Sequence, residues 1–349
     1  MREFDYTKLP EGLAGPEIMN LVSAVHEHRG RQLLHLAARR DVLDALVEIA
    51  KVQSIESSNR IEGIRTSDKR LREIVADTTG LRSRDEEEIA GYRDVLRMVH
   101  ENYEFINVTP NVILQLHRVM YKRTPSSLGG HFKVGDNEIR GIRPDGSEYV
   151  RFRPVPAVAA PDAVERLCSA LDEGLDAGRI DPLVLSLMFV FDFTCIHPFN
   201  DGNGRLSRLL TLLLLYKAGY AVGRYISLEK EIERTKGDYY DALAASSQGW
   251  NEGANDPGPF VRYMLGVMMA AYRDFEDRVS LAANGASTKA ERVEAFLRES
   301  VGKVTKADIL TACPDISKVT VERSLHALLM LGKIEKVGVS RSTGYLWVG

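Results

Sequence analysis

The sequence has few cysteines, and none of them stands in a metal-binding or disulfide pattern. Its 349 residues include three cysteines, at positions 168, 195 and 313, which lie far apart in apolar, helix-like segments. An odd number of cysteines at such distances argues against a disulfide framework, and no pair has the spacing of a zinc site. We therefore expect a protein of the reducing cytoplasm.

The sequence also lacks a strong excess of charge. The net charge is −3, charged residues make up 27% and hydrophobic residues 44% of the chain, which is ordinary for a globular protein. The net charge of the whole chain therefore does not indicate nucleic-acid binding, although a local basic patch is compatible with it. The first twelve residues contain no apolar leader segment. Asp192 and His197 interrupt the longest apolar run, so we expect a core helix there and no membrane association.

Most of the remaining sequence has the hydrophobic spacing of helices. Apolar residues recur at helical intervals over residues 16–64, 111–121 and 161–175. Residues 68–100 are charged and helical in pattern, and we expect Glu86, Glu87 and Glu88 to form a solvated face there. The fold class predicted from these patterns is mostly α.

One polar run interrupts two apolar helices and organises the chain. It extends from His197 to Arg208 and has the sequence HPFNDGNGRLSR. Apolar segments at 183–196 and 209–216 flank it, so the run is a turn between two core helices. Its glycines permit backbone conformations that a side chain would block, and the second helix is expected to start near Gly204.

This run combines the parts of a phosphate-handling site. The free N–H groups of a helix start, together with Arg205 and Arg208, favour phosphates. Asp201 beside them is a candidate ligand for a divalent cation, and His197 is a candidate for proton transfer. Each feature alone is common in ordinary turns, and only their combination within twelve residues indicates phosphoryl or nucleotidyl transfer.

Two other chemistries are less consistent with the same region. Cys195 could act as a nucleophile with His197, but residues two apart do not face each other on a helix. The chain contains no Gly-x-x-x-x-Gly-Lys-Ser/Thr segment, so the phosphate site is not a P-loop.

The run resembles the signature of the Fic family, His-x-Phe-x-Asp/Glu-Gly-Asn-Gly-Arg-x-x-Arg, at every fixed position. The resemblance implies a helical bundle that transfers AMP from ATP to a hydroxyl group of a target protein. It implies that His197 is the general base and that Asp201 binds Mg²⁺. The remaining implied nucleotide contacts come from the turn and the two arginines, namely Gly202, Asn203, Gly204, Arg205 and Arg208.

A second segment resembles the family's inhibitory motif, Ser/Thr-x-x-x-Glu-Gly/Asn. It comprises Ser58, Glu62 and Gly63 and lies near the end of a predicted inhibitory helix at about 45–63. Gly63 can cap that helix. The resemblance implies that Glu62 pairs with Arg208 and so keeps this arginine from the γ-phosphate of ATP.

A predicted hairpin at about 137–153 resembles the family's flap. The run Pro144-Asp145-Gly146-Ser147 separates two strand-like segments and is typical of a turn. The resemblance implies that a target protein docks there by strand addition. An ordinary surface hairpin is the alternative. Five basic residues near it favour an acidic target or nucleotide phosphates: Lys133, Arg140, Arg143, Arg151 and Arg153.

Three later residues are candidates for the nucleotide pocket. Tyr239 and Tyr240 resemble a family element that lines the adenine site, although paired tyrosines on a helix more often border a core. Asn251 is a further candidate contact.

The C-terminal residues 288–349 predict a winged helix. Thr288, Thr305 and Ser317 can each cap a helix, and a hairpin follows from residue 332. Residues 288–349 contain ten Lys or Arg and seven Asp or Glu, so the module is only mildly basic. Winged helices also bind proteins or form dimers, which leaves DNA binding and a homodimer open. The candidate DNA contacts are Lys318, Thr320, Arg323 and Arg341.

These observations predict three parts: an N-terminal helical region at 1–100, a Fic catalytic domain at 101–281 and a winged helix at 288–349. The predicted function is a self-inhibited protein adenylyltransferase whose target could be another protein or the chain itself. Two alternatives are a DNA-binding regulator whose Fic domain senses nucleotide, and an enzyme that removes AMP from modified proteins.

Overall fold

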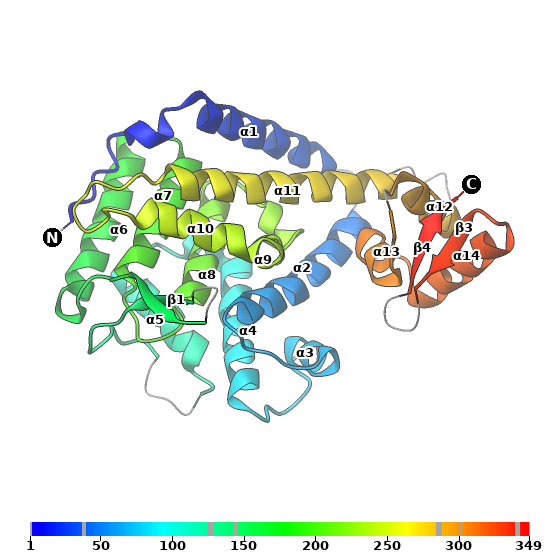
Figure 1. Cartoon of the computed structure of the whole chain (residues 1–349), viewed down its shortest axis with the longest axis horizontal. Helices are drawn as coiled ribbons and strands as arrows, with labels where there is room; N and C mark the ends of the chain where they lie inside the picture. Colours follow the sequence, from blue (N-terminus) through cyan, green and yellow to red (C-terminus); the bar gives the residue numbers. More distant parts are fainter. Residues whose placement is uncertain are drawn as a thin grey trace.

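The computed structural model describes residues 2–36, 40–124, 129–142, 146–283, 288–300, 302–338 and 343–348. It confirms the mostly α fold class, with two short hairpins (Figure 1). The helices are α1 (Pro16–Leu36), α2 (Arg40–Ile61), α3 (Asp68–Val75), α4 (Arg84–Asn102), α5 (Pro110–Tyr121), α6 (Ala160–Ala177), α7 (Pro182–Ile196), α8 (Asn203–Lys217), α9 (Leu228–Arg234), α10 (Lys236–Ser247), α11 (Gly258–Ala283), α12 (Lys289–Glu299), α13 (Lys306–Ala312) and α14 (Lys318–Met330). The strands are β1 (Ile139–Ile142), β2 (Glu148–Phe152), β3 (Ile334–Val337) and β4 (Gly344–Trp347).

Two separate hydrophobic cores organise the described chain. The larger core extends from Tyr6 to Val279, and α7 and α8 are buried within it along nearly their whole length. The long helix α11 crosses this part of the molecule, with α1 packed along it (Figure 1). Residues 1–100 and 101–281 therefore share one core. The smaller core, from Val293 to Tyr345, belongs to the C-terminal module alone.

The helix α2 lies close to the predicted turn because it packs on α4, α8 and α9. Gly63 lies two residues after the end of this helix and has φ +84°, which is the left-handed conformation of a C-terminal cap. The predicted solvated face at the start of α4 is wrong for two of its three residues. Glu86 and Glu88 are buried, and each is paired with arginine, Glu86 with Arg70 in a bidentate contact of 2.7 and 2.9 Å.

The C-terminal module contains the predicted order of three helices and a hairpin, in which β3 and β4 pair antiparallel. Thr288, Thr305 and Ser317 cap α12, α13 and α14, as their positions predict. Lys318 and Arg323 are exposed on α14, and Thr320 is half-buried beside Ser317. Arg341 lies outside the described residues, and DNA binding stays a prediction.

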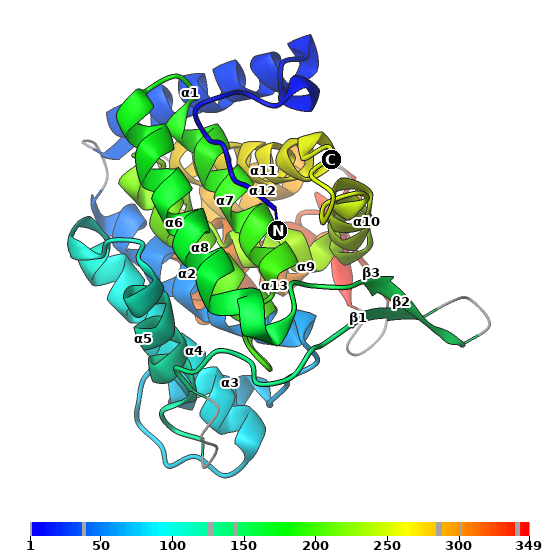
Figure 2. The same ribbon diagram turned by 90° about the vertical axis from the view of Figure 1, so that its left-hand side faces the viewer.

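None of the helices in the described part of the chain combines the length and the hydrophobicity that crossing a membrane requires. The residues Arg143, Pro144 and Asp145 of the predicted hairpin turn lie outside the described residues. The rest of this hairpin is present, with β1 and β2 antiparallel and projecting away from the helices (Figure 2).

Candidate active site

The polar run joins α7 to α8 through two left-handed backbone positions. His197 follows the last residue of α7 with φ 51° and ψ 59°, and Gly202 precedes α8 with φ 79°. A Cβ atom at Gly202 would lie 2.7 Å from Cε of Met120 and 2.8 Å from the hydroxyl of Tyr121, so only glycine fits there. The helix α8 begins at Asn203, one residue before the expected position.

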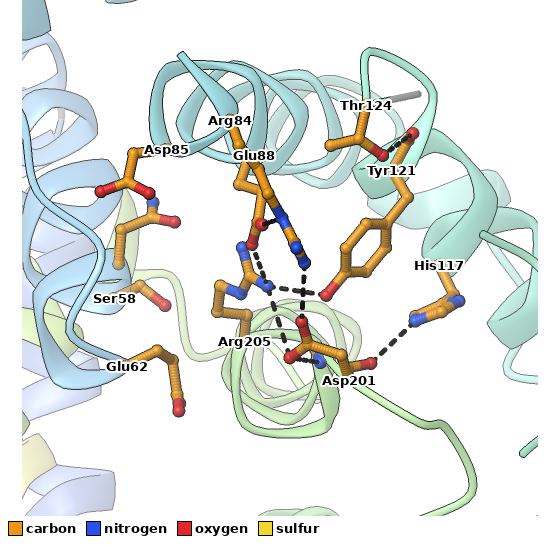
Figure 3. Close-up of polar contacts among 12 residues, drawn as sticks. Ser58, Glu62, Arg84, Asp85, Glu88, His117, Tyr121, Thr124, Asp201 and Arg205 are labelled. Carbon is orange, nitrogen blue, oxygen red and sulfur yellow. Dashed lines mark hydrogen bonds and ion pairs between the residues drawn. The ribbon is translucent and has the colours of Figure 1, made fainter. Parts of the chain in front are cut away.

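Side chains around this loop hold its backbone in place. The Asn203 side chain accepts a hydrogen bond from the Phe199 N–H at 2.9 Å and donates to the Phe199 carbonyl at 2.8 Å. The Phe199 ring stacks on His117, with centroids 3.8 Å apart. Because Nδ1 of His117 accepts the Gly130 N–H, its Nε2 donates to the Asp201 carbonyl at 3.0 Å (Figure 3). His117 therefore has a structural role here.

His197 is in the state that a general base requires. Its Nδ1 donates to the Thr194 carbonyl at 3.3 Å, which leaves Nε2 without a proton in the neutral ring. Burial lowers the pKa of His197 from 6.5 to about 4. The imidazole is consequently neutral at physiological pH and can accept a proton from a group in the cavity that it lines.

A cavity of about 550 Å³ opens beside His197, between the start of α8, the hairpin and α10. Tyr239 and Tyr240 line it from α10, together with apolar Leu243 and Ala244. Asn251 is not among the residues that line this cavity. Its Nδ2 instead donates to the Arg153 carbonyl at 3.2 Å, which ties the end of the hairpin to the body of the molecule.

Arg208 is almost fully buried and makes all its described hydrogen bonds to the end of α2. Its Nε donates to the Ser58 hydroxyl at 2.8 Å, and its Nη2 donates to the Ser58 carbonyl at 2.9 Å and to Oε1 of Glu62 at 2.7 Å. The predicted contact between Glu62 and Arg208 is therefore present. A Cβ at Gly204 would lie 2.3 Å from Oε1 of Glu62, so this carboxylate rests against the first turn of α8.

Arg205 points away from the cavity, unlike Arg208. Its guanidinium is 1% exposed and pairs with Glu88 at 2.7 Å and with the Tyr121 hydroxyl at 2.7 Å (Figure 3). Glu88 also binds Nε of Arg84 at 2.7 Å. The guanidinium groups of Arg84 and Arg205 lie 3.7 and 3.8 Å, respectively, from the half-exposed carboxylate of Asp201. Sequence reasoning missed Glu88, because only its burial identifies it as the partner of Arg205.

Most of the basic residues near the hairpin already have partners in the protein. Arg140 pairs with Glu148 at 2.9 Å, and Arg153 pairs with Glu138 at 3.3 Å. The Arg151 guanidinium lies over the ring of Tyr240, 5.0 Å from its centroid, at the cavity wall. The described part of the hairpin therefore does not present a block of unpaired positive charge.

Cys195 lines the same cavity but is buried. Burial raises the pKa of its thiol well above the ordinary value, so the reactive thiolate is disfavoured. Proton transfer to His197 is accordingly the better-supported chemistry at this end of the cavity.

Comparisons with known proteins find similar sequences that share one name. The "protein adenylyltransferase Fic" of Drosophila erecta is 27% identical over 287 residues, which cover 75% of this chain and 53% of that protein. The protein of the same name from Culex quinquefasciatus is 29% identical over 223 residues, covering 62% and 39%. The chain thus spans about half the length, or less, of these relatives.

The fold also matches a solved structure. A Fic family protein from Desulfovibrio desulfuricans G20 superposes with a TM-score of 0.62 at 22% identity, covering 96% of this chain and 97% of that one. The model of the Fic/DOC family matches residues 107–215, which include α7, α8 and the whole polar run between them. Over these residues, the chain is similar to the Fic/DOC family.

Proposed function

We propose that the chain is a protein adenylyltransferase that moves AMP from ATP to a hydroxyl side chain of a target protein. The observation that carries this proposal is the neutral His197, with a proton-free Nε2, beside a cavity that also holds the start of α8 and Arg208. The proposal agrees with the printed name of the relatives, protein adenylyltransferase Fic.

In this reaction His197 removes the proton from the target hydroxyl. The hydroxyl oxygen then forms a bond to the α-phosphorus of ATP, and the bond from that phosphorus to the bridging oxygen breaks. Pyrophosphate leaves with the electron pair of that bond. The first turn of α8 supports charge on the phosphates, because the N–H groups of Asn203 and Gly204 have no carbonyl one turn before them within the helix.

The cavity walls suggest how ATP lies in it. We infer that Arg208 contacts the terminal phosphates from the α8 side, since its guanidinium is at the cavity. The adenine is expected between the α10 wall, with Tyr239 and Tyr240, and the hairpin. We assign Arg205 a supporting role through Glu88, because both side chains are buried.

Asp201 fits a magnesium ion that is held largely by the nucleotide. The described residues contain no cluster of three or more potential metal ligands, so a cation would need phosphate and water oxygens to complete its shell. Mg²⁺ commonly binds through one carboxylate and substrate phosphates. When bound, Mg²⁺ would neutralise phosphate charge.

We further propose that Glu62 restrains this activity. Its carboxylate neutralises Arg208 and lies against the start of α8, where a terminal phosphate would otherwise bind. ATP can then reach Arg208 only if Glu62 moves away. The buried contacts of Ser58 with Arg208 hold the end of α2 in the inhibiting position.

The target is proposed to dock on the hairpin as an additional strand. Tyr149 and Val150 of β2 are exposed there and would give the docked segment an apolar contact. Since Arg140 and Arg153 are paired with glutamates, the hairpin itself provides little preference for an acidic target.

Transfer of label from α-labelled ATP tests the proposal. We expect label on protein with Glu62→Gly, much less with the wild type, and none with Glu62→Gly combined with His197→Ala. Absence of label in all three, with sequence-specific DNA binding, would favour the DNA-binding regulator. Release of AMP from a pre-modified protein would favour the AMP-removing enzyme.

A further inference from the structure

His197 has a backbone conformation that needs support. Among the described residues, only Asp77 and His197 are non-glycine residues with positive φ. The left-handed region costs a non-glycine residue about 1 kcal/mol or more, and it persists only when neighbouring contacts enforce it. Because this conformation sets the direction in which the Cα–Cβ bond of His197 leaves the backbone, contacts that enforce it also help to orient the ring.

Lys133 contacts the chain on both sides of His197. Its Nζ donates to the Ile196 carbonyl at 3.4 Å, and its backbone N–H donates to the Pro198 carbonyl at 2.9 Å. Its Nζ also donates to Oδ1 of Asn137 at 2.8 Å, and Nδ2 of Asn137 donates to the Phe199 carbonyl at 3.2 Å. Lys133 and Asn137 thus bind three backbone carbonyls around His197, at residues 196, 198 and 199.

The burial of Lys133 is costly and therefore calls for an explanation. The residue is 3% exposed, and within the described ranges no carboxylate pairs with it. Burial lowers its pKa to about 8, so the ammonium still carries its charge at neutral pH. The charge lies at the C-terminal end of α7, where helix carbonyls favour a cation. A methionine of similar length would avoid the cost of desolvation, which suggests that the charge serves the site.

We propose that Lys133 is a positioning residue for the transfer reaction, holding His197 between the Ile196 and Pro198 carbonyls so that Nε2 faces the cavity. The proposal rests on the proposed role of His197 as the base. Lys133 itself does not line the cavity, so it acts through His197 and not on the substrate.

The ammonium has a second effect on the base. The charged groups that act on His197 are Lys133 from the segment before β1, Glu62 directly after α2 and Asp201 from the same loop. Lys133 opposes protonation of the imidazole, whereas the two carboxylates favour it. Removing the ammonium should therefore make His197 easier to protonate.

The test uses the full chain with Glu62→Gly as the active parent, and adds Lys133→Met, Lys133→Arg or Asn137→Ala. Lys122→Met, an exposed lysine at the end of α5, is the matched control. Three quantities are measured: the titration of the His197 ring by NMR, kcat and KM for AMP transfer, and the affinity for a non-hydrolysable ATP analogue.

With Lys133→Met we expect the pKa of His197 to rise by about half a unit or more. We also expect kcat to fall about tenfold or more, with nucleotide affinity within twofold of the parent. Lys133→Arg should restore the low pKa and part of kcat, and Lys122→Met should change nothing. Asn137→Ala leaves the ammonium of Lys133 in place, so it should lower kcat with little effect on the pKa of His197. This variant replaces Lys133→Met in the test if Lys133→Met does not fold.

An unchanged His197 titration and an unchanged kcat in Lys133→Met would overturn the proposal. Equal losses of kcat and nucleotide affinity, without a change in the titration, would also overturn it, because they indicate a general structural role. If the Glu62→Gly parent transfers no AMP, the proposed function fails, whereas the NMR titration still tests the influence of Lys133 on His197.

Discussion

Replacing Glu62 with glutamine removes the charge that neutralises Arg208 while keeping nearly the same shape. The substitution removes the negative charge from a hydrogen bond of 2.7 Å, which runs from an arginine that is 4% exposed to a carboxylate that is 33% exposed. Such bonds contribute about 1.5–3 kcal/mol, and the partial exposure of Glu62 favours the lower half of that range. Because about 1.4 kcal/mol corresponds to a factor of ten, we expect Glu62→Gln to bind nucleotide about 10- to 30-fold more tightly.

The same substitution should lower stability when no nucleotide is present. Arg208 keeps its two hydrogen bonds to Ser58, so it does not become wholly unpaired, and we expect a loss of about 1–2 kcal/mol. Saturating nucleotide should offset most of this loss, because binding that is 10- to 30-fold tighter adds about 1.4–2 kcal/mol to the free energy of unfolding. The two effects together distinguish competition for Arg208 from simple damage to α2.

Calorimetric titration with a non-hydrolysable ATP analogue, and urea unfolding with and without it, would measure both effects. Glu56→Gln is the matched control, because Glu56 lies on the same helix but pairs with Arg60. The control should bind nucleotide like the wild type. Affinity of Glu62→Gln within twofold of the wild type would refute the competition between Glu62 and ATP for Arg208.

Three further predictions concern the proposed base His197, the pairing of Arg205 with Glu88, and the effect of pH on stability. In the Glu62→Gly background, His197→Ala should reduce AMP transfer at least about 100-fold while nucleotide affinity, measured by calorimetry, stays within a few-fold. Glu88→Gln removes the carboxylate that pairs with the buried Arg205. Urea unfolding should show that the free energy of unfolding falls by about 3 kcal/mol. No loss of stability would contradict the supporting role of this pair. Burial lowers the pKa of His100 from 6.5 to about 3 and that of His117 from 6.5 to about 4. Because the unfolded chain then binds more protons, stability should be full above pH 6.5 and fall progressively towards pH 3. An unchanged urea midpoint between pH 7 and 4 would contradict this.

The residues that make up the candidate site could be identified from the sequence because they are local. A base, an acid, a glycine turn and two arginines lie within twelve residues, and the left-handed φ of Gly202 is a property of that turn. Helix caps at Thr288, Thr305 and Ser317 are likewise local, since each contact spans only three residues. The pairing of Glu62 with Arg208, 146 residues apart, was accessible only through the resemblance to a family.

The roles of individual charged residues depended on the tertiary structure. Charge patterning predicted a solvated face at 86–88, yet packing of α4 against α8 buries Glu88 and makes it the partner of Arg205. The two signature arginines are three residues apart, but only Arg208 reaches the cavity. In the sequence Lys133 is one basic residue among several, and nothing in its neighbourhood there indicates that it is buried beside His197. Local sequence determines which groups are present and how the turn bends, whereas long-range packing decides which of these groups lose water and which partner each one meets.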